Sequence, residues 1–139
     1  MVKSITEKCS AKINIAIDVL GKYPNGYHEV RMIMTQVGIF DVITISLKDE
    51  KGIEIAGSDI NMPVDESNLA WKAANEFFKA IKFDGGCDIY IEKHIPMGAG
   101  MAGGSSDAAG VINGLNKLFD SPLSLEERMK MGKKLGADV

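Results

Sequence analysis

Residues 96–110 read PMGAGMAGGSSDAAG, which places five glycines and two adjacent serines between a predicted strand and a predicted helix. Glycine at this density is costly, because glycine loses more conformational entropy on folding than any other residue. The start of a helix also exposes unpaired backbone N–H groups at the positive end of its dipole, and both features favour a bound anion. The stretch therefore predicts a phosphate-binding loop, with a tight turn that binds nothing as the alternative.

The known glycine-rich phosphate motifs fit this stretch only in part. Gly98, Gly100 and Gly103 satisfy the dinucleotide pattern G-x-G-x-x-G, but the preceding strand alternates apolar and polar residues instead of being continuously apolar. Gly104 stands where the Walker A motif requires its lysine, so that motif fails. What remains is a glycine–serine loop that binds phosphates through its backbone and its helix, with two hydroxyls that can help to hold Mg²⁺.

The residues around this loop show the periodicities of a mixed fold. Strand patterns, alternating or short and extended, cover residues 9–19, 30–36, 41–47, 53–56 and 87–92. Helical spacing of apolar residues covers residues 65–82, 108–119 and 124–136. Runs of strands followed by helices predict an α+β domain with a largely antiparallel sheet and helices on one side.

Capping residues indicate where the three helices begin. Asp65 or Ser67 is expected to cap the first helix, and the SSD of residues 105–107 supplies caps for the second. Residues 124–127, SLEE, form a capping box for the third helix, which Gly136 is expected to end.

The composition is that of an ordinary globular domain, since 45% of the 139 residues are hydrophobic and 25% are charged. A net charge of −3 gives no electrostatic footprint for nucleic acid, and no apolar run is long enough for a membrane helix. The N-terminus lacks a signal-peptide core, so we expect a cytoplasmic protein with neither nucleic acid nor membrane as a partner. Cys9 and Cys87 are too few for a disulfide framework or a four-ligand zinc site.

Four segments together resemble one family. They are AKINIAIDVLGK at residues 11–22, NGYHEV at 25–30, IPMGAGMAGGSSDAA at 95–109 and GAD at 136–138. Through them the chain resembles the GHMP small-molecule kinase superfamily over essentially its whole length. The resemblance implies that residues 1–139 are the N-terminal, ATP-binding domain of such a kinase, with a ribosomal-protein-like α/β sandwich fold. The C-terminal domain that completes the family's active-site cleft is expected to be absent from this sequence, which ends abruptly on an apolar residue after a helix.

Within the superfamily, AKIN together with GYHE resembles the branch that phosphorylates a cytidine-diphosphate-linked methylerythritol at its 2-hydroxyl, with ATP and Mg²⁺, in non-mevalonate isoprenoid synthesis. The resemblance implies that Asp138 accepts the hydroxyl proton, while Lys12 orients this carboxylate and stabilises phosphoryl charge. It places Asn14, Tyr27 and His28 at the substrate, and it assigns no metal-ligating residue. The ATP-binding positions that it implies are Pro96, Met97, Gly98, Ala99, Gly100, Met101, Ala102, Gly103, Gly104, Ser105, Ser106, Asn68 and Lys93.

Each of these residues also has an ordinary structural interpretation. A lone lysine such as Lys12 on a strand is usually a solvated charge, Asp138 fits a turn after a helix, and Asn68 fits a helix cap. For the whole chain, the alternatives are a GHMP kinase acting on mevalonate derivatives, homoserine or galactose, a non-enzymatic RNA-binding domain, and a dinucleotide oxidoreductase. We expect a monomer or weak homodimer that folds but turns over poorly alone, because Asp138 lies next to the C-terminus.

Overall fold

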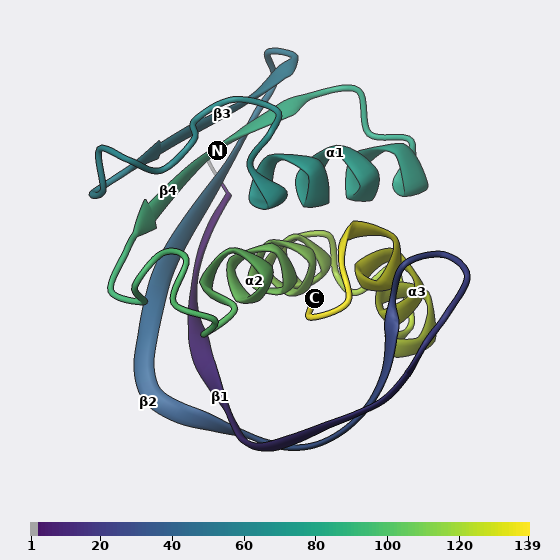
Figure 1. The fold of residues 1–139 in the computed structure, drawn as a ribbon. Coiled ribbons are helices and arrows are strands. Elements are labelled where there is room, and N and C mark those ends of the chain that lie inside the picture. Colours follow the sequence, from purple (N-terminus) through teal and green to yellow (C-terminus); the bar gives the residue numbers. More distant parts are fainter. Residues whose placement is uncertain (1–2) are drawn as a thin grey trace.

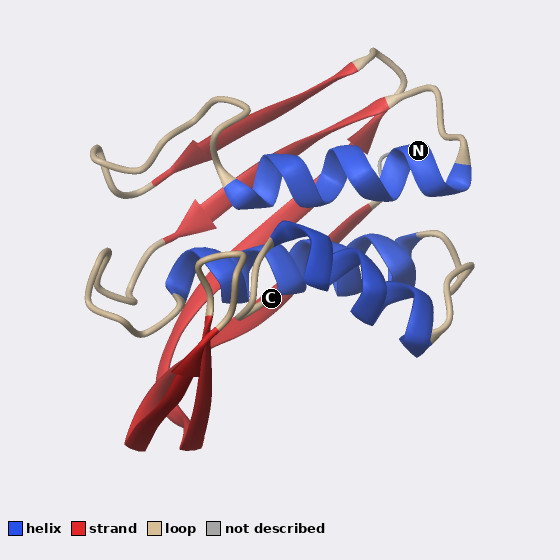
Figure 2. Cartoon of the chain, turned by 45° about the vertical axis from the view of Figure 1, so that its right-hand side comes forward, coloured by secondary structure: helices blue, strands red, loops and turns tan. Residues whose placement is uncertain are grey.

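The computed structural model describes residues 3–139 as a β-sheet covered on one face by helices (Figures 1 and 2). In chain order the elements are β1 (Ser4–Lys22), β2 (His28–Lys48), β3 (Gly52–Gly57), α1 (Leu69–Ile81), β4 (Gly86–Glu92), α2 (Gly103–Leu118) and α3 (Leu125–Leu135). The sheet has the order β1-β2-β4-β3, with antiparallel β1–β2 and β2–β4 pairs and a parallel β3–β4 pair. The predicted α+β fold with a largely antiparallel sheet is confirmed.

The core lies between the inner face of the sheet and helices α1 and α2. Alternate residues of β2 and β4 point inward and are buried, and the helices add small, aliphatic and aromatic side chains. These core residues include Ile43, Ile45, Ile89, Ile91, Ala73, Ala74, Phe77, Val111 and Leu115. Most of the intervening residues of these strands are polar and are partly or fully exposed, which explains the alternation in the sequence.

One predicted break in the sheet is wrong. The sequence predicts separate strands over residues 30–36 and 41–47, but β2 runs through both without interruption. Residues 37–39 face the single Ala11 of β1, because the register passes from Ser10–Phe40 to Lys12–Gln36. A bulge therefore absorbs the extra residues, and bulges bend and twist strands instead of ending them.

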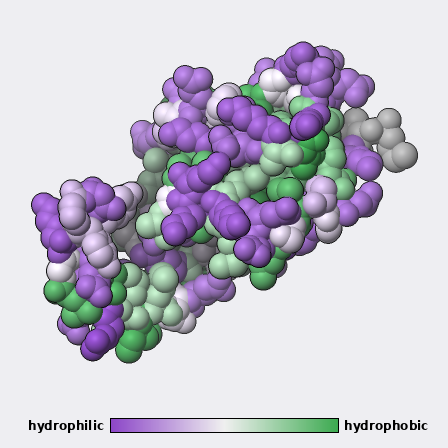
Figure 3. Space-filling model, turned by 90° about the vertical axis from the view of Figure 1, so that its right-hand side faces the viewer, coloured by the Kyte–Doolittle hydropathy of each residue, from purple (hydrophilic) through white to green (hydrophobic). Residues whose placement is uncertain are grey.

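Beyond this bulge, β1 and β2 leave the body of the domain as a curved two-stranded ribbon, formed by residues 13–22 and 28–36 (Figure 1). Many of its apolar side chains are exposed, for example Ile15 and Val19, each 63% accessible. In the space-filling view the ribbon forms an outlying lobe with apolar surface (Figure 3).

The cap of α1 is Asn68, a role that its residue type allowed, in place of Asp65 or Ser67, and the start of α2 differs from the prediction. Helix α1 is capped by Asn68, whose side-chain oxygen accepts a hydrogen bond from the N–H of Ala70, and Asp65 instead accepts from the N–H of Ser67 in the preceding turn. Helix α2 starts at Gly103 with no side-chain cap, so residues 105–107 lie inside the helix. The capping box of Ser124 and Glu127 at α3 is confirmed. None of the helices described is long and apolar enough to cross a membrane.

Candidate active site

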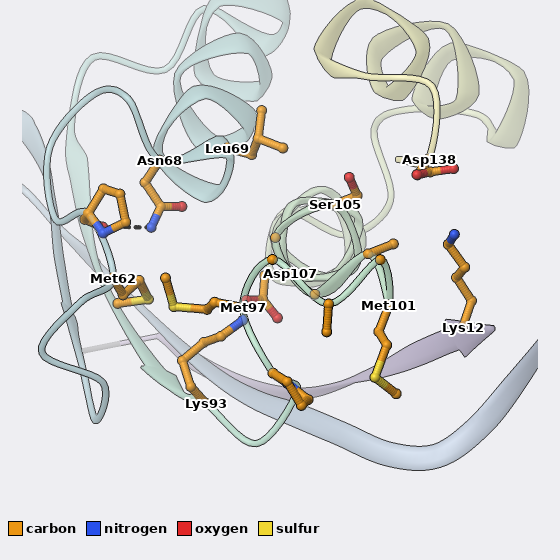
Figure 4. A pocket seen from close by; sticks show the side chains of 18 of the residues that line it. Lys12, Met62, Asn68, Leu69, Lys93, Met97, Met101, Ser105, Asp107 and Asp138 are labelled. Carbon is orange, nitrogen blue, oxygen red and sulfur yellow. Dashed lines mark hydrogen bonds and ion pairs between the residues drawn. The ribbon is translucent and has the colours of Figure 1, made fainter.

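A cavity of about 440 Å³ opens where the glycine-rich loop meets helices α1 and α2 (Figure 4). The loop forms most of its wall, and the turn before α1 and two charged residues from the chain ends complete it. The residues that line it are Lys12, Met62, Pro63, Ser67, Asn68, Leu69, Lys93, Pro96, Met97, Gly98, Ala99, Gly100, Met101, Ala102, Gly103, Gly104, Ser105, Asp107 and Asp138. The structure thus brings together most residues that the resemblance assigns to ATP and both that it assigns to catalysis.

The shape of the loop depends on left-handed backbone. Gly98 and Gly100 have φ values of 71° and 73°, and Ala102 at the start of α2 has a φ of 56°. A side chain at the two glycines would be strained, so their identity follows from the turn itself. The loop then enters α2 without a capping side chain. The first N–H groups of a helix have no intrahelical partner, and those of α2 are therefore available to an anion in the cavity.

Two hydrogen bonds join the loop to β1 at the bulge. The backbone N–H of Lys12 donates to the carbonyl of Met101 at 3.1 Å, and the hydroxyl of Ser106 donates to the carbonyl of Ser10 at 2.7 Å. The hydroxyl of Ser106 is consequently used between α2 and β1, and Ser106 does not line the cavity, whereas Ser105 does. These bonds hold the strand that carries Lys12 beside the loop.

Lys12 and Asp138 lie at the same edge of the cavity. Lys12 extends from β1, and Asp138 follows the end of α3, so that the two charged groups point toward the same space beside Ser105 (Figure 4). Lys12 is partly buried and Asp138 is exposed. An ammonium and a carboxylate in this arrangement can hold a hydroxyl group between a proton acceptor and a positive charge.

A group of three buried charged residues, which we call the buried charge cluster, lies beneath the loop. It consists of Asp41 at the inner face of β2, Lys93 after β4, and Asp107 in α2. The ammonium of Lys93 is 2.6 Å from Oδ2 of Asp41 and 3.0 Å from Oδ2 of Asp107. The other oxygen of Asp41 accepts hydrogen bonds from the N–H groups of His94 and Ile95 at 2.6 and 2.9 Å. Lys93 therefore lines the cavity with an ammonium that is already paired.

The two carboxylates of the cluster differ in their pKa. Burial, together with the neighbouring Asp41, raises the pKa of Asp107 to about 7. Burial acts in the same direction on Asp41, but hydrogen bonds from Asp107, Ile95 and Lys93 outweigh it and lower the pKa of Asp41. Oδ1 of Asp107 is buried and has no hydrogen-bond partner among the residues described. Asp41 is therefore the carboxylate that stays ionised and balances the charge of Lys93. Asp107 is the carboxyl group of the cluster that changes its protonation state near neutral pH.

Asn68 is also engaged within the protein. Its amide nitrogen donates to the carbonyl of Pro63 at 2.7 Å, and its oxygen caps α1 (Figure 4). The side chain thus fixes the turn that forms one wall of the cavity. The apolar side chains of Met62 and Leu69 line the same wall and were not expected from the sequence.

The residues that the resemblance assigns to the substrate lie apart from this cavity. Asn14 pairs with Met34 in the ribbon, and Tyr27 and His28 stand at its tip, where Tyr27 is 64% accessible. None of the three lines the cavity. Their role at a substrate stays a prediction.

Asp41 and Asp107 are the charged residues of the site that sequence reasoning missed. Each had a detectable signal. Asp41 lies on the same inward-facing side of β2 as Ile43 and Ile45. Asp107 lies beside the apolar stripe of α2, next to Ala108. A charged side chain at a buried position of a strand or helix is rarely found without a partner. The positions of Asp41 and Asp107 in the sequence therefore each indicated a buried ion pair.

The chain is similar to known proteins over almost its whole length. A family model described as the GHMP kinases N terminal domain matches residues 68–139, just over half of the chain. The 4-diphosphocytidyl-2-C-methyl-D-erythritol kinases of Lachnoclostridium phytofermentans and Geobacter metallireducens are 49% and 45% identical to it, over 97% and 99% of this chain. These matches cover 46% and 49% of the two relatives, so the chain spans about half their length.

Solved structures show the same fold. A crystal structure of 4-(cytidine 5'-diphospho)-2C-methyl-D-erythritol kinase superposes with a TM-score of 0.82 and 32% identity, over 97% of this chain and 47% of that one. Methanococcus jannaschii mevalonate kinase superposes with a TM-score of 0.73 and 17% identity, over 98% of this chain and 47% of that one. At this low identity the second likeness shows the fold alone.

Proposed function

The chain belongs to the GHMP kinases, and on that premise we propose that it is the ATP-binding half of an enzyme that phosphorylates 4-diphosphocytidyl-2-C-methyl-D-erythritol. The reaction would transfer the γ-phosphoryl group of ATP to the 2-hydroxyl of this alcohol. Relatives named for that activity, at 45–49% identity, support the choice of substrate. Because they are about twice as long as this chain, we also propose that a further domain completes the active site.

The observation that carries the proposal is the uncapped start of α2 at the cavity that Lys12 and Asp138 border. Free N–H groups at the start of a helix can bind the phosphates of a nucleotide. Phosphate binding of this kind does not require a lysine in the loop. The carboxylate and the ammonium at the edge suit the acceptor hydroxyl. Groups suited to binding phosphate and a group suited to accepting a proton thus line one cavity, which supports phosphoryl transfer as the reaction.

In the proposed reaction the hydroxyl oxygen of the alcohol attacks the γ-phosphorus of ATP. The bond between this phosphorus and the bridging oxygen of ADP breaks, and the hydroxyl proton passes to the carboxylate of Asp138. Lys12 orients that carboxylate and stabilises the negative charge on the transferred group. The backbone N–H groups of residues 103–105 hold the phosphates that remain on ADP.

Mg²⁺ fits this site as a companion of the nucleotide. Within residues 3–139 there is no group of three His, Cys, Asp or Glu side chains that could form a metal cage. Mg²⁺ usually keeps several waters and binds through one or two protein ligands plus substrate phosphates. Among the side chains that line the cavity, the hydroxyl of Ser105 could supply such a ligand. When bound, the ion would neutralise phosphate charge.

We further propose that Asn14, Tyr27 and His28 contact the cytidine end of the substrate. They lie on the ribbon, away from the phosphate loop, and a long substrate with a diphosphate link could extend from one to the other. The exposed apolar face of the ribbon offers a surface for the base, and the aromatic ring of Tyr27 can stack on it. No observation on this chain favours mevalonate, homoserine or galactose as the acceptor.

The test uses this chain and the product of the complete reading frame that contains it. Titration calorimetry is expected to show one MgATP bound per chain. Phosphorus NMR is expected to show transfer to the cytidine-bearing alcohol by the reading-frame product, and no transfer to mevalonate, homoserine or galactose under the same conditions. Failure to bind MgATP would remove the nucleotide site. Transfer to one of the other alcohols alone would leave a kinase and overturn the substrate.

A further inference from the structure

The buried charge cluster of Asp41, Lys93 and Asp107 connects the two ends of the glycine-rich loop. Lys93 lies three residues before Pro96, where the loop begins, and Asp107 lies in the first turns of α2, into which the loop leads. Asp41 belongs to neither end and fixes both to the sheet, because one of its oxygens pairs with Lys93 and the other accepts two backbone N–H groups. The loop is therefore closed at its base by ion pairs.

Stability alone is a weak account of such a cluster. Three ionisable side chains, those of Lys93, Asp41 and Asp107, are withdrawn from water, with exposures of 5%, 0% and 3%. Replacing a buried ion pair by apolar residues of similar size is often neutral or stabilising, because the desolvation of the charges offsets their attraction. A cluster of this kind beneath a ligand-binding loop is more simply explained by the geometry that it imposes on the loop.

The ammonium of Lys93 also touches the start of α2. A Cβ atom added to Gly103 would lie 3.1 Å from this ammonium and 3.0 Å from Ile95, so both sit directly against the backbone of Gly103. The backbone of Lys93 is itself held by a hydrogen bond of 2.8 Å from its N–H to the hydroxyl of Ser58. The position of Lys93 is thus transmitted to the N–H groups at the helix start.

We propose that Asp41, Lys93 and Asp107 are positioning residues, which set the spacing between the two ends of the loop and thereby the geometry of its phosphate-binding N–H groups. Lys93 then acts on the nucleotide through the loop, and not by contact with the base. This inference rests on the proposed function, since it concerns how the same site holds phosphate. It replaces a ligand contact by Lys93, which the family resemblance implied, with an indirect role.

The experiment compares ligands that contain different parts of the nucleotide. The probes are MgATP, magnesium tripolyphosphate and adenosine, each titrated calorimetrically into the wild-type chain and into Lys93→Met. If the cluster positions the loop, the affinities for MgATP and tripolyphosphate fall by the same factor. That factor should be at least about tenfold, which corresponds to one lost hydrogen bond to a charged group. Adenosine binding stays unchanged. Lys79→Met, an exposed lysine on α1, is the matched control and should alter none of the three.

A weakened affinity for MgATP with unchanged tripolyphosphate binding would show that Lys93 contacts the base, and would overturn the proposal. So would unchanged affinity for both. Failure of the wild-type chain to bind either phosphate ligand would overturn the proposed function, and this inference with it. The two failures are distinguishable because the first requires a wild-type chain that binds.

A second variant separates positioning from folding. Lys93→Met leaves two buried carboxylates facing each other, and the chain could lose stability for that reason. Lys93→Met/Asp107→Asn removes this repulsion, and urea unfolding followed by the fluorescence of Trp71 should show recovered stability. Under the proposal the tripolyphosphate affinity stays low in this double variant, because the closure of the loop is still missing. Recovery of affinity together with stability would show a merely structural cluster and overturn the proposal.

Discussion

The backbone N–H of Lys12 donates a hydrogen bond of 3.1 Å to the carbonyl of Met101, and this bond joins β1 to the glycine-rich loop. The bond forms where β1 passes the bulge in β2, and the hydroxyl of Ser106 adds a second link to the carbonyl of Ser10. The proposed catalytic lysine and the proposed phosphate loop are therefore parts of one rigid unit, although about ninety residues separate them in the sequence.

The adjacent serines of the loop should respond differently to substitution. Ser106→Ala removes the partly buried hydrogen bond to Ser10 and should lower the free energy of unfolding by about 1 kcal/mol. Ser105→Ala should leave stability unchanged and weaken MgATP binding, because the hydroxyl of Ser105 lines the cavity. Urea unfolding and titration calorimetry on both variants check this. If Ser106→Ala weakened MgATP binding and Ser105→Ala did not, the result would contradict the geometry described for α2.

Asp138 and Lys12 are expected to act on turnover more than on nucleotide binding. In the product of the complete reading frame, Asp138→Asn should lower kcat by roughly 10²- to 10⁴-fold, the usual contribution of a general base, with little change in the affinity for MgATP. Lys12→Met should also lower kcat. Asp49→Asn, on an exposed turn, serves as the control. A kcat of Asp138→Asn within a factor of two of the wild type would show that another group accepts the proton.

Packing of α2 against β1 depends on Gly110. A Cβ at this position would overlap the sulfur of the buried Cys9, and it would also crowd Ile43. Gly110→Ala should therefore destabilise the chain by about 1–3 kcal/mol, as is typical of overpacking. Cys9→Ala makes room for the added methyl group, so the double variant should be more stable than Gly110→Ala alone. Equal stability of these two variants in urea would refute this account of the contact.

The pH dependence of stability should report Asp107. Its pKa of about 7 in the folded chain lies above the value of about 3.9 for an unperturbed carboxyl group. The folded state therefore holds the proton more tightly, and the stability contributed by Asp107 is lost as the pH rises through 7. Asp41, whose pKa is lowered, acts oppositely and loses its contribution only as the pH falls toward strongly acidic values.

The measurement is urea unfolding of the wild type and of Asp107→Asn between pH 5 and pH 8. The wild type should lose stability relative to this variant across the range. The groups facing Asp107 are Asp41, Lys93 and the thiol of Cys9, whose pKa burial raises to about 12, so none of them changes charge in this window. Asp88→Asn is the control, because a hydrogen bond from Lys48 lowers the pKa of Asp88. A constant difference for Asp107→Asn would contradict the assignment.

Much of the fold could be predicted from the sequence because its signals are local. Alternation marked the inward residues of β2 and β4, and the capping box at Ser124 marked the start of α3. The continuity of β2 could not be predicted, since it depends on a bulge whose partner, Ala11, lies in another strand. The uncapped start of α2 was missed as well, because residues with good capping propensity, Ser105 among them, stand one turn inside the helix.

The candidate site likewise contains residues that could be predicted from the sequence and residues that could not. The loop was evident from its glycines, and family resemblance supplied Lys12 and Asp138, which no local pattern would have singled out. Asp41 and Asp107 each stand at a buried position of their element, but they are sixty-six residues apart, and no pattern in the sequence identified Lys93 as their common partner. Pairings of this kind arise from the tertiary packing of a strand, a loop and a helix.

The most direct test of the central claim is MgATP binding by Gly104→Val. Gly104 lines the cavity at the start of α2, and a Cβ there would meet no protein atom within 4 Å, so the variant should fold as well as the wild type. Gly103 is less suitable, because its Cβ would press on Ile95 and Lys93. In calorimetry the wild type should bind MgATP, and Gly104→Val should bind it at least about tenfold more weakly, with an unchanged urea midpoint. Equal affinity in the two chains would show that phosphates do not approach the backbone of this loop, and the account of the cavity as a nucleotide site would be wrong.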